Sequence, residues 1–85
     1  MAILLAMRET IRQYLQEALE EVKGYSLPQL SDDVHLPSLG VSSIDFMSSI
    51  QIVSDRLGID IKTEELLGIT KVGQLLNVFE RKLQK

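Results

Sequence analysis

Apolar residues recur every three or four positions through most of this 85-residue chain, and this spacing constrains its fold more than any other feature. One apolar face runs from Leu4 to Val22 and stops before Gly24. A second runs from Phe46 to Leu57 and stops before Gly58. A period near 3.6 residues is that of an amphipathic helix, and glycine favours the position just after a helix end. Because no pair of alternating runs suggests a β-hairpin, the sequence predicts an all-α fold.

Four helical segments follow from these patterns, and together they predict a small four-helix bundle that forms one domain over residues 1–85. We expect helices over residues 4 or 7 to 23, over 43–57 and over a short third segment 63–67, and a fourth helix with Thr70 as its N-cap. The last helix carries an apolar stripe of Val72, Leu75, Leu76, Phe79 and Leu83. In the second helix, a stripe at spacings of four, three and four predicts the core face, which comprises Phe46, Ile50, Val53 and Leu57.

A long first loop separates the first two helices. Residues 24–41 contain both prolines of the chain and no sustained period. A loop of this length is uncommon in so small a domain unless it has a function or packs against the rest. Five apolar residues are expected to pin it across the helices: Leu27, Leu30, Val34, Leu36 and Leu39.

The N-terminal residues 1–6 have two interpretations. Ala2 to Ala6 form an apolar run too short for a membrane span, and no basic residue precedes it as in a signal peptide. The run is either an extension of the first helix, or it results from a start codon assigned too early, in which case Met7 is the natural first residue. Without a targeting signal, the expected location is the cytoplasm, and the expected state is a monomer.

Composition excludes several classes of function. The chain has no cysteine and one histidine, His35, so neither a disulfide nor a metal site is expected. Its net charge of −3 and the lack of a basic stripe argue against nucleic-acid binding. A triad of Ser43, His35 and Asp45 is also excluded, because Ser43 and Asp45 lie two positions apart on one helix and point in different directions. We therefore expect a protein that is not an enzyme.

The segment Leu39 to Phe46 carries the functional signal. Gly40 lies in a turn that delivers Ser43 to the first turn of the second helix. Ser42 and Asp45 match the S-x-x-[DE] pattern in which a serine caps a helix. A helix N-terminus offers unpaired N–H groups and the positive end of the helix dipole, so it favours a phosphate attached to Ser43.

This segment and those that follow it resemble acyl carrier proteins. Residues 36–40 are similar to the leucine-x-x-leucine-glycine approach to the modified serine of that family. Residues 57–61 resemble the segment that links its second and third helices, and 63–66 its short acidic third helix. Residues 69–72 resemble the I-T-x-V opening of its last helix. The resemblance covers about residues 36–80, in the family's order and spacing.

The resemblance implies a covalent carrier. A phosphopantetheinyl transferase would attach 4′-phosphopantetheine from coenzyme A to the Ser43 hydroxyl, which makes the protein a phosphoprotein. The arm would hold acyl, aminoacyl or polyketide groups as thioesters for acyl-loading, acyl-transfer or condensing enzymes. The competing interpretation is a helical protein–protein interaction module without a prosthetic group.

Two departures from the family pattern concern its partners. Ser42 replaces the aspartate that usually precedes the modified serine, and Ile44 replaces the usual leucine that follows it. Fatty-acid carriers have a second helix rich in glutamate, whereas this helix offers Ser48, Gln51 and Ser54. A specialised pathway is therefore favoured over housekeeping fatty-acid synthesis. The expected partner-binding residues are Ile44, Asp45, Met47, Gln51, Leu67 and Ile69, and for the last two a place in the core is the alternative.

Overall fold

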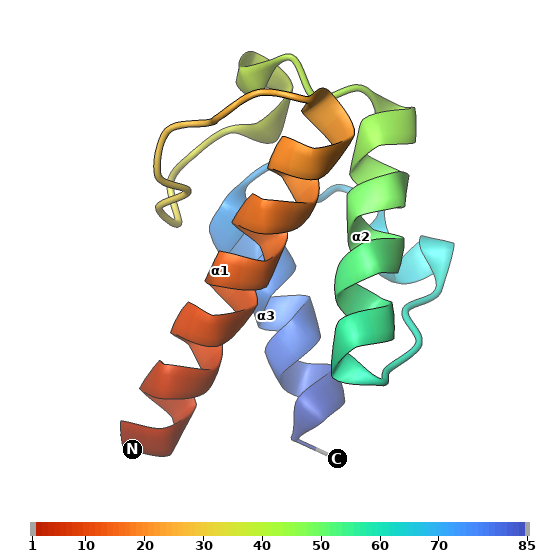
Figure 1. The fold of residues 1–85 in the computed structure, drawn as a ribbon. Coiled ribbons are helices and arrows are strands. Elements are labelled where there is room, and N and C mark those ends of the chain that lie inside the picture. The colour runs from red at the N-terminus through yellow and green to blue at the C-terminus, as the bar shows by residue number, and fades with distance from the viewer. Residues whose placement is uncertain (1, 85) are drawn as a thin grey trace.

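The computed structural model describes residues 2–84, with side chains from Met7 onward. In this part the chain forms α1 (Ala2–Lys23), η1 (Leu36–Leu39), α2 (Ser43–Leu57), η2 (Thr63–Leu66) and α3 (Val72–Leu83), where η denotes a short 3-10 helix. In Figure 1, α1 and α2 stand side by side, and α3 passes behind them. The described residues contain no strand, so the predicted all-α fold is confirmed.

The expected third helix is only a single turn, so the described part of the chain has three α-helices rather than four. Residues Thr63–Leu66 form hydrogen bonds between residues three apart, from Glu65 N to Lys62 O at 3.0 Å and from Ile69 N to Leu66 O at 3.2 Å. Four residues are too few to build a ladder of α-helical bonds, so the segment closes as η2.

The core is aliphatic, with Phe79 of α3 as its one fully buried aromatic side chain among the described residues. The apolar faces of all three α-helices meet there. The core residues contributed by these helices include Ile11, Leu15, Leu19, Ile50, Val53, Val72, Leu75 and Leu76. The predicted stripe of α3 is therefore confirmed, although Leu83 at its end is only half-buried.

The long loop is folded onto α1. Leu30 and Leu36 are fully buried, and Leu27, Val34 and Leu39 pack half-buried against the core. Two α1 side chains also hold the backbone of Leu30: Arg12 donates to its carbonyl at 2.7 Å, and Gln16 accepts from its N–H at 3.2 Å. The expectation that the five apolar loop residues hold the loop against the helices is confirmed.

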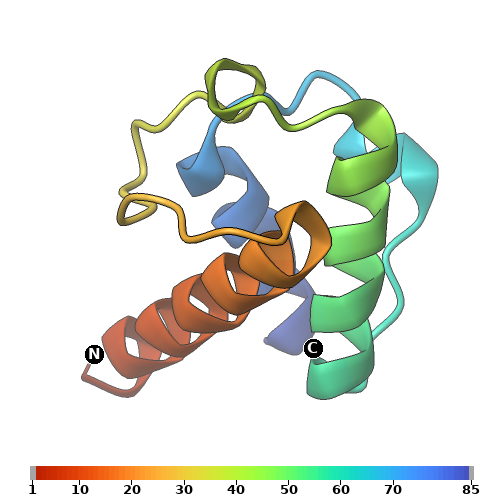
Figure 2. The same ribbon diagram turned by 45° about the horizontal axis from the view of Figure 1, so that its top comes forward.

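The second half of this loop pairs with the start of α3. Leu36 N donates to Thr70 O at 2.8 Å, Val72 N to Val34 O at 3.0 Å, and Gly73 N to Asp32 O at 2.9 Å. A Cβ at position 73 would lie 3.0 Å from the Cβ of Asp32, so glycine allows this close approach without displacing Asp32. Figure 2 shows the loop passing the beginning of α3 on its way to η1.

Thr70 does not cap α3, contrary to the expectation. The N-cap is Lys71, and Gln74 accepts hydrogen bonds from the N–H groups of Thr70 and Lys71 at 3.0 and 3.1 Å. Because Gln74 accepts from the N–H groups of Thr70 and Lys71, and loop carbonyls accept from those of Val72 and Gly73, the Thr70 hydroxyl is not needed as a cap. α3 therefore starts two residues later than Thr70.

An arginine of α1 joins the loop to α3 on the outside of the bundle. Arg8 forms an ion pair with Asp32 at 2.7 Å and a second one with Glu80 of α3. Arg12 also pairs with Asp32 at 2.7 Å. Of the helices in the described part of the chain, none combines the length and the apolarity of a membrane span.

Candidate functional site

The site lies where the long loop meets α2. Gly40 adopts a left-handed conformation with φ 78°, which a residue with a side chain would adopt only under strain, and it turns the chain toward Ser42. Ser42 is the N-cap of α2: its Oγ accepts from Asp45 N at 3.1 Å, and its own N–H donates to Asp45 Oδ2 at 3.3 Å. The predicted capping pair and the predicted bounds of α2 are both confirmed.

Ser43 is the first residue of α2, and its side chain is exposed. No hydrogen bond involves its hydroxyl among the described residues, whereas the adjacent Ser42 hydroxyl is engaged in capping. The N–H groups of Ser43 and Ile44 lie in the first turn, where a helix supplies no carbonyl partner. The structure therefore presents a free hydroxyl beside two N–H groups that can bind an anion.

A small cavity of about 140 Å³ opens beside Ser43. η1, the two residues directly before α2, the first turns of α2, and the segment before α3 each contribute to its lining. Its walls are mostly apolar and consist of Leu36, Pro37, Val41, Ser42, Ser43, Phe46 and Ile69. The anion-binding helix start and the apolar cavity together fit a phosphodiester followed by a flexible, largely uncharged arm.

Lys23, the last residue of α1, ties that helix to the site. Its Nζ donates to Gly40 O at 2.8 Å and to Asp45 Oδ2 at 3.1 Å, and it lies 5.9 Å from the centre of the Tyr25 ring. The hydrogen bond from Lys23, with that from the Ser42 N–H, holds the pKa of Asp45 below its usual value. Asp45 in turn raises the pKa of Lys23. Lys23 is far from Asp45 in the sequence, so no local sequence pattern indicates that the two residues are in contact.

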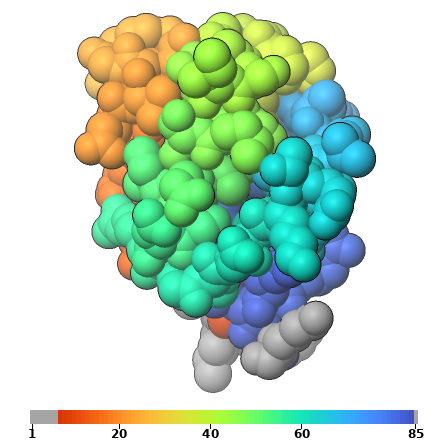
Figure 3. All heavy atoms as spheres, turned by 90° about the vertical axis from the view of Figure 1, so that its right-hand side faces the viewer, coloured from red at the N-terminus to blue at the C-terminus, as the bar shows by residue number. Residues whose placement is uncertain are grey.

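Three of the expected partner-binding residues are exposed apolar side chains. Ile44 is 78% exposed, Leu67 76% and Met47 40%. Figure 3 shows the face that carries α2 together with the segment between α2 and α3, to which these residues belong. Apolar side chains that form a contiguous exposed patch are typical of interaction surfaces, whereas single exposed ones are common on any protein surface.

The other three expected partner-binding residues have contacts within the protein. Gln51 is exposed and donates to Asp55 at 2.9 Å. Asp45 is half-buried in its bonds with Ser42 and Lys23. Ile69 is also half-buried, and it packs against the core and lines the cavity beside Ser43.

Two expectations about α2 need correction. Ser54 was expected on the exposed face, but it is buried, because it lies beside Val53 and one turn after Ile50 on the inward side of the helix. Phe46 and Leu57 were expected in the core, but both are half-buried and pack against it from the two ends of α2. The Phe46 ring also forms part of the cavity wall.

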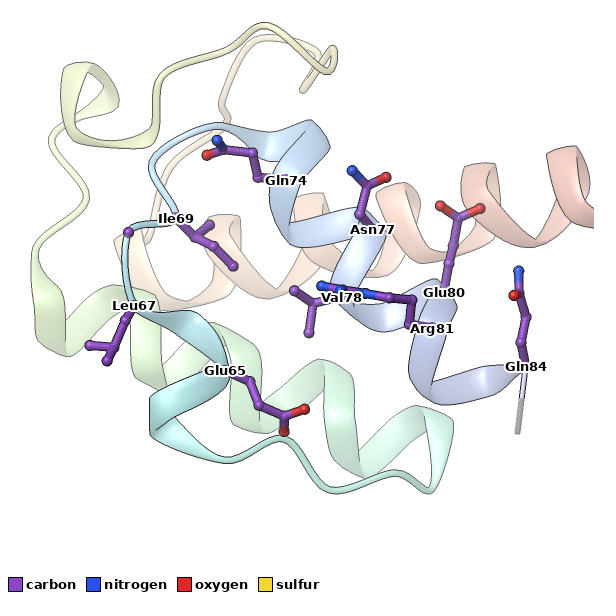
Figure 4. A pocket seen from close by; sticks show the side chains of 10 residues that line it. Glu65, Leu67, Ile69, Gln74, Asn77, Val78, Glu80, Arg81 and Gln84 are labelled. Atoms are coloured by element: carbon purple, nitrogen blue, oxygen red, sulfur yellow. The ribbon is translucent and has the colours of Figure 1, made fainter.

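A larger hollow of about 630 Å³ lies between η2 and the outer face of α3. Figure 4 shows that the side chains lining it are mainly polar, including Glu65 and Arg81, with Leu67, Ile69 and Val78 as its apolar members. It shares only Ile69 with the Ser43 cavity. The residues 67–69 therefore separate the two hollows. No group of His, Cys, Asp and Glu side chains in the described part of the chain has a metal-binding arrangement.

Comparison with known proteins identifies the family. The model of the phosphopantetheine attachment site family matches residues 13–79, which is well over half of the chain and includes α2 with Ser43. An acyl carrier protein homolog of Ureaplasma parvum serovar 3 is 35% identical over 48 residues, which cover 56% of this chain and 62% of the relative. The chain therefore spans less than two thirds of that relative's length. No solved structure matches the chain.

The chain belongs to the phosphopantetheine attachment site family, the family of the acyl carrier proteins. The prosthetic group of this family is 4′-phosphopantetheine, covalently attached. The start of α2 offers an exposed hydroxyl on Ser43 and an adjoining, mostly apolar cavity.

Proposed function

We propose that Ser43 is the attachment residue for 4′-phosphopantetheine and that the protein is an acyl carrier. One observation carries the choice of residue. Of the two adjacent serines, Ser42 uses its hydroxyl as the cap of α2, whereas the Ser43 hydroxyl is exposed and has no hydrogen bond among the described residues. Only Ser43 can therefore react without opening the helix cap.

The residues around Ser43 have distinct tasks in this proposal. The Ser43 oxygen forms a phosphodiester with the pantetheine phosphate of coenzyme A, and a phosphopantetheinyl transferase supplies the catalysis. The N–H groups at the start of α2 stabilise the resulting negative charge. Pro37, Phe46 and Ile69 offer an apolar wall along which the first part of the arm lies. When bound, the group supplies a terminal thiol that holds acyl, aminoacyl or polyketide groups as thioesters.

The domain contributes tethering rather than bond chemistry. Because the cargo stays attached to the carrier, each encounter with an enzyme presents it at a high effective concentration. We propose that acyl-loading, acyl-transfer or condensing enzymes recognise the exposed apolar residues Ile44, Met47 and Leu67. The expectation of a cytoplasmic monomer stays a prediction.

The decisive experiment is intact-protein mass after incubation with coenzyme A and a broad-specificity phosphopantetheinyl transferase. The wild-type protein should gain the mass of one arm, and Ser43→Ala should gain none. Ser42→Ala is the matched control. It should still be modified, although more slowly, because loss of the N-cap destabilises the start of α2 by about 1 kcal/mol. Modification of Ser43→Ala would refute the assignment, and an unmodified wild type would favour the interaction-module alternative.

We further propose a specialised pathway rather than housekeeping fatty-acid synthesis. The exposed side of α2 carries Ser48 and Gln51, and its acidic residue Asp55 is hydrogen-bonded to Gln51. Fatty-acid enzymes that recognise their carriers by charge complementarity would therefore gain little electrostatic attraction from this face of α2.

A gain of charge on α2 tests this pathway assignment. Ser48→Glu should raise the rate with a fatty-acid ketosynthase, chiefly by faster association, and added salt should reduce the gain. Ser54 is unsuitable for this test because it is buried. If the unaltered carrier already served that ketosynthase as well as an acidic fatty-acid carrier does, the pathway assignment would be wrong.

A further inference from the structure

In the described part of the chain, two ion pairs join α1 to α2, and we call them ties; only one of them lies at the Ser43 site. At the far end of α2, Arg56 forms an ion pair with Glu17 at 2.7 Å and lies 3.9 Å from the centre of the Tyr14 ring. At the near end, Lys23 pairs with Asp45 at 3.1 Å beside the Tyr25 ring. The tie at Lys23 has one additional bond, to the carbonyl of Gly40.

That additional bond matters because of where it falls in the sequence. Gly40 precedes Ser43 by three residues, and Asp45 follows it by two. A single ammonium group therefore holds the chain on both sides of Ser43 and fixes both sides to the end of α1. The side chains of Lys23 and Asp45 are 18% and 23% exposed, so water screens this pair less than it screens the exposed Arg56–Glu17 pair.

The same ammonium group also supports the helix cap. Asp45 Oδ2 accepts from both Lys23 and the Ser42 N–H, so Lys23 orients the carboxylate that closes the capping box. If Lys23 were absent, the Gly40 turn would depend on its left-handed backbone and on one bond from its N–H to Pro37 O at 3.1 Å. The turn and the first residues of α2 would then have more conformational freedom.

We propose that Lys23 is a positioning residue for the modification of Ser43, an inference that rests on the proposed function. Lys23 acts through Gly40 and Asp45 to keep the Ser43 turn in the conformation that a phosphopantetheinyl transferase binds. It touches neither the reacting hydroxyl nor, in this role, the enzyme.

A positioning role predicts a particular pattern of kinetics. If only a fraction of the carrier has the correct turn, the apparent affinity falls by that fraction, while the rate at saturation stays the same. For Lys23→Met, which keeps much of the aliphatic stem and removes the charge, we expect KM for the carrier to rise roughly fivefold. The value of kcat should change by less than about twofold. Lys23→Arg, which keeps a cationic donor, should recover most of the loss.

Arg56→Met is the matched control, since it removes the other tie between the same two helices. Arg56 lies about 16 Å along α2 from Asp45, at 1.5 Å per residue. If Lys23 acted only through general stability, both variants would lower the denaturation midpoint and both would change the modification kinetics. The proposal expects only Lys23→Met to change KM.

A measurement without the enzyme separates positioning from direct contact with the transferase. Amide hydrogen exchange at Ser42 and Asp45, followed by NMR, should be faster in Lys23→Met than in the wild type and unchanged in Arg56→Met. Unchanged exchange at both amides would overturn the proposal, as would a lower KM in Lys23→Met, which would mean that Lys23 shields Asp45 from the enzyme.

The modification of the wild type is measured first, and it distinguishes the two levels of inference. A wild-type protein that takes no arm refutes the proposed function and the role of Lys23 with it. A modified wild type with equal KM values for Lys23→Met and the unaltered protein refutes only the role of Lys23.

Discussion

Replacing Leu30 by alanine tests whether the long loop contributes to stability like a core element. The Leu30 side chain is 0% exposed although it lies outside every helix. Its N–H and carbonyl are both held by α1 side chains at 3.2 and 2.7 Å, so the backbone cannot easily move inward to fill the space that alanine would leave. Substitutions of buried leucine by alanine cost about 2.7–5.0 kcal/mol, the higher values where the site cannot collapse.

We expect a loss of at least about 3 kcal/mol for Leu30→Ala, because the two bonds to its backbone limit how far the loop can close over the space that alanine leaves. A domain of this size has a total stability of roughly 4–13 kcal/mol, so the loss is a large fraction of it. The thermal midpoint should fall by about 15 °C. Urea denaturation measures the free energy of unfolding, and Ser31→Ala, at the adjacent exposed position, is the control with an expected change within about 0.5 kcal/mol. A loss as small as that of the control would mean that the loop is not packed in solution.

Two further predictions concern α2 and acid. Phe46→Ala should lower the free energy of unfolding by about 2 kcal/mol, less than for a fully buried phenylalanine, because Phe46 packs half-buried against the core. Met47→Ala should lower it by less than about 1 kcal/mol, because Met47 is 40% exposed. Equal losses in chemical denaturation would contradict the observed faces of α2. Hydrogen bonds from Arg8 and Arg12 lower the pKa of Asp32, and those from Lys23 and Ser42 lower the pKa of Asp45. The two carboxylates therefore stabilise the folded protein fully above the pKa of unfolded aspartate. This stabilisation is lost as the pH falls through the lower pKa of the folded state. The urea midpoint should therefore stay nearly level from pH 7 to about 5 and fall below pH 4, with a smaller fall in Asp32→Asn; a midpoint that rises on acidification would show that these carboxylates do not stabilise the fold.

The elements that the sequence predicted correctly have local causes. The bounds of α2 follow from Ser42, Asp45 and Gly58, which act within one turn of the helix ends. The α3 stripe follows from helical periodicity, which needs no knowledge of the partner. Ser43 as a candidate attachment residue follows from its place after the Gly40 turn, and its assignment stays a prediction.

The errors and omissions have long-range causes. Thr70 has a side chain that often caps helices, but the carbonyls of Asp32 and Val34 already accept from the first N–H groups of α3. Ser54 is polar, yet it is buried, because the packing of the other elements against α2, and not the polarity of a single side chain, decides which side of the helix is covered. Lys23 reaches Gly40 and Asp45 only once the loop has closed, so no local pattern contains that contact.

The pairing of residues 32–36 with 70–73 has a consequence for how the chain folds. The first two N–H groups of α3 donate to carbonyls that lie about forty positions earlier in the sequence. A peptide with only the α3 sequence would lack these acceptors and would fray at its beginning. α3 therefore gains its full order only when the loop is already in place on α1. Unfolding of the loop and of α3 should accordingly be one cooperative event, with a single transition whether it is followed at Tyr14 or by overall helicity.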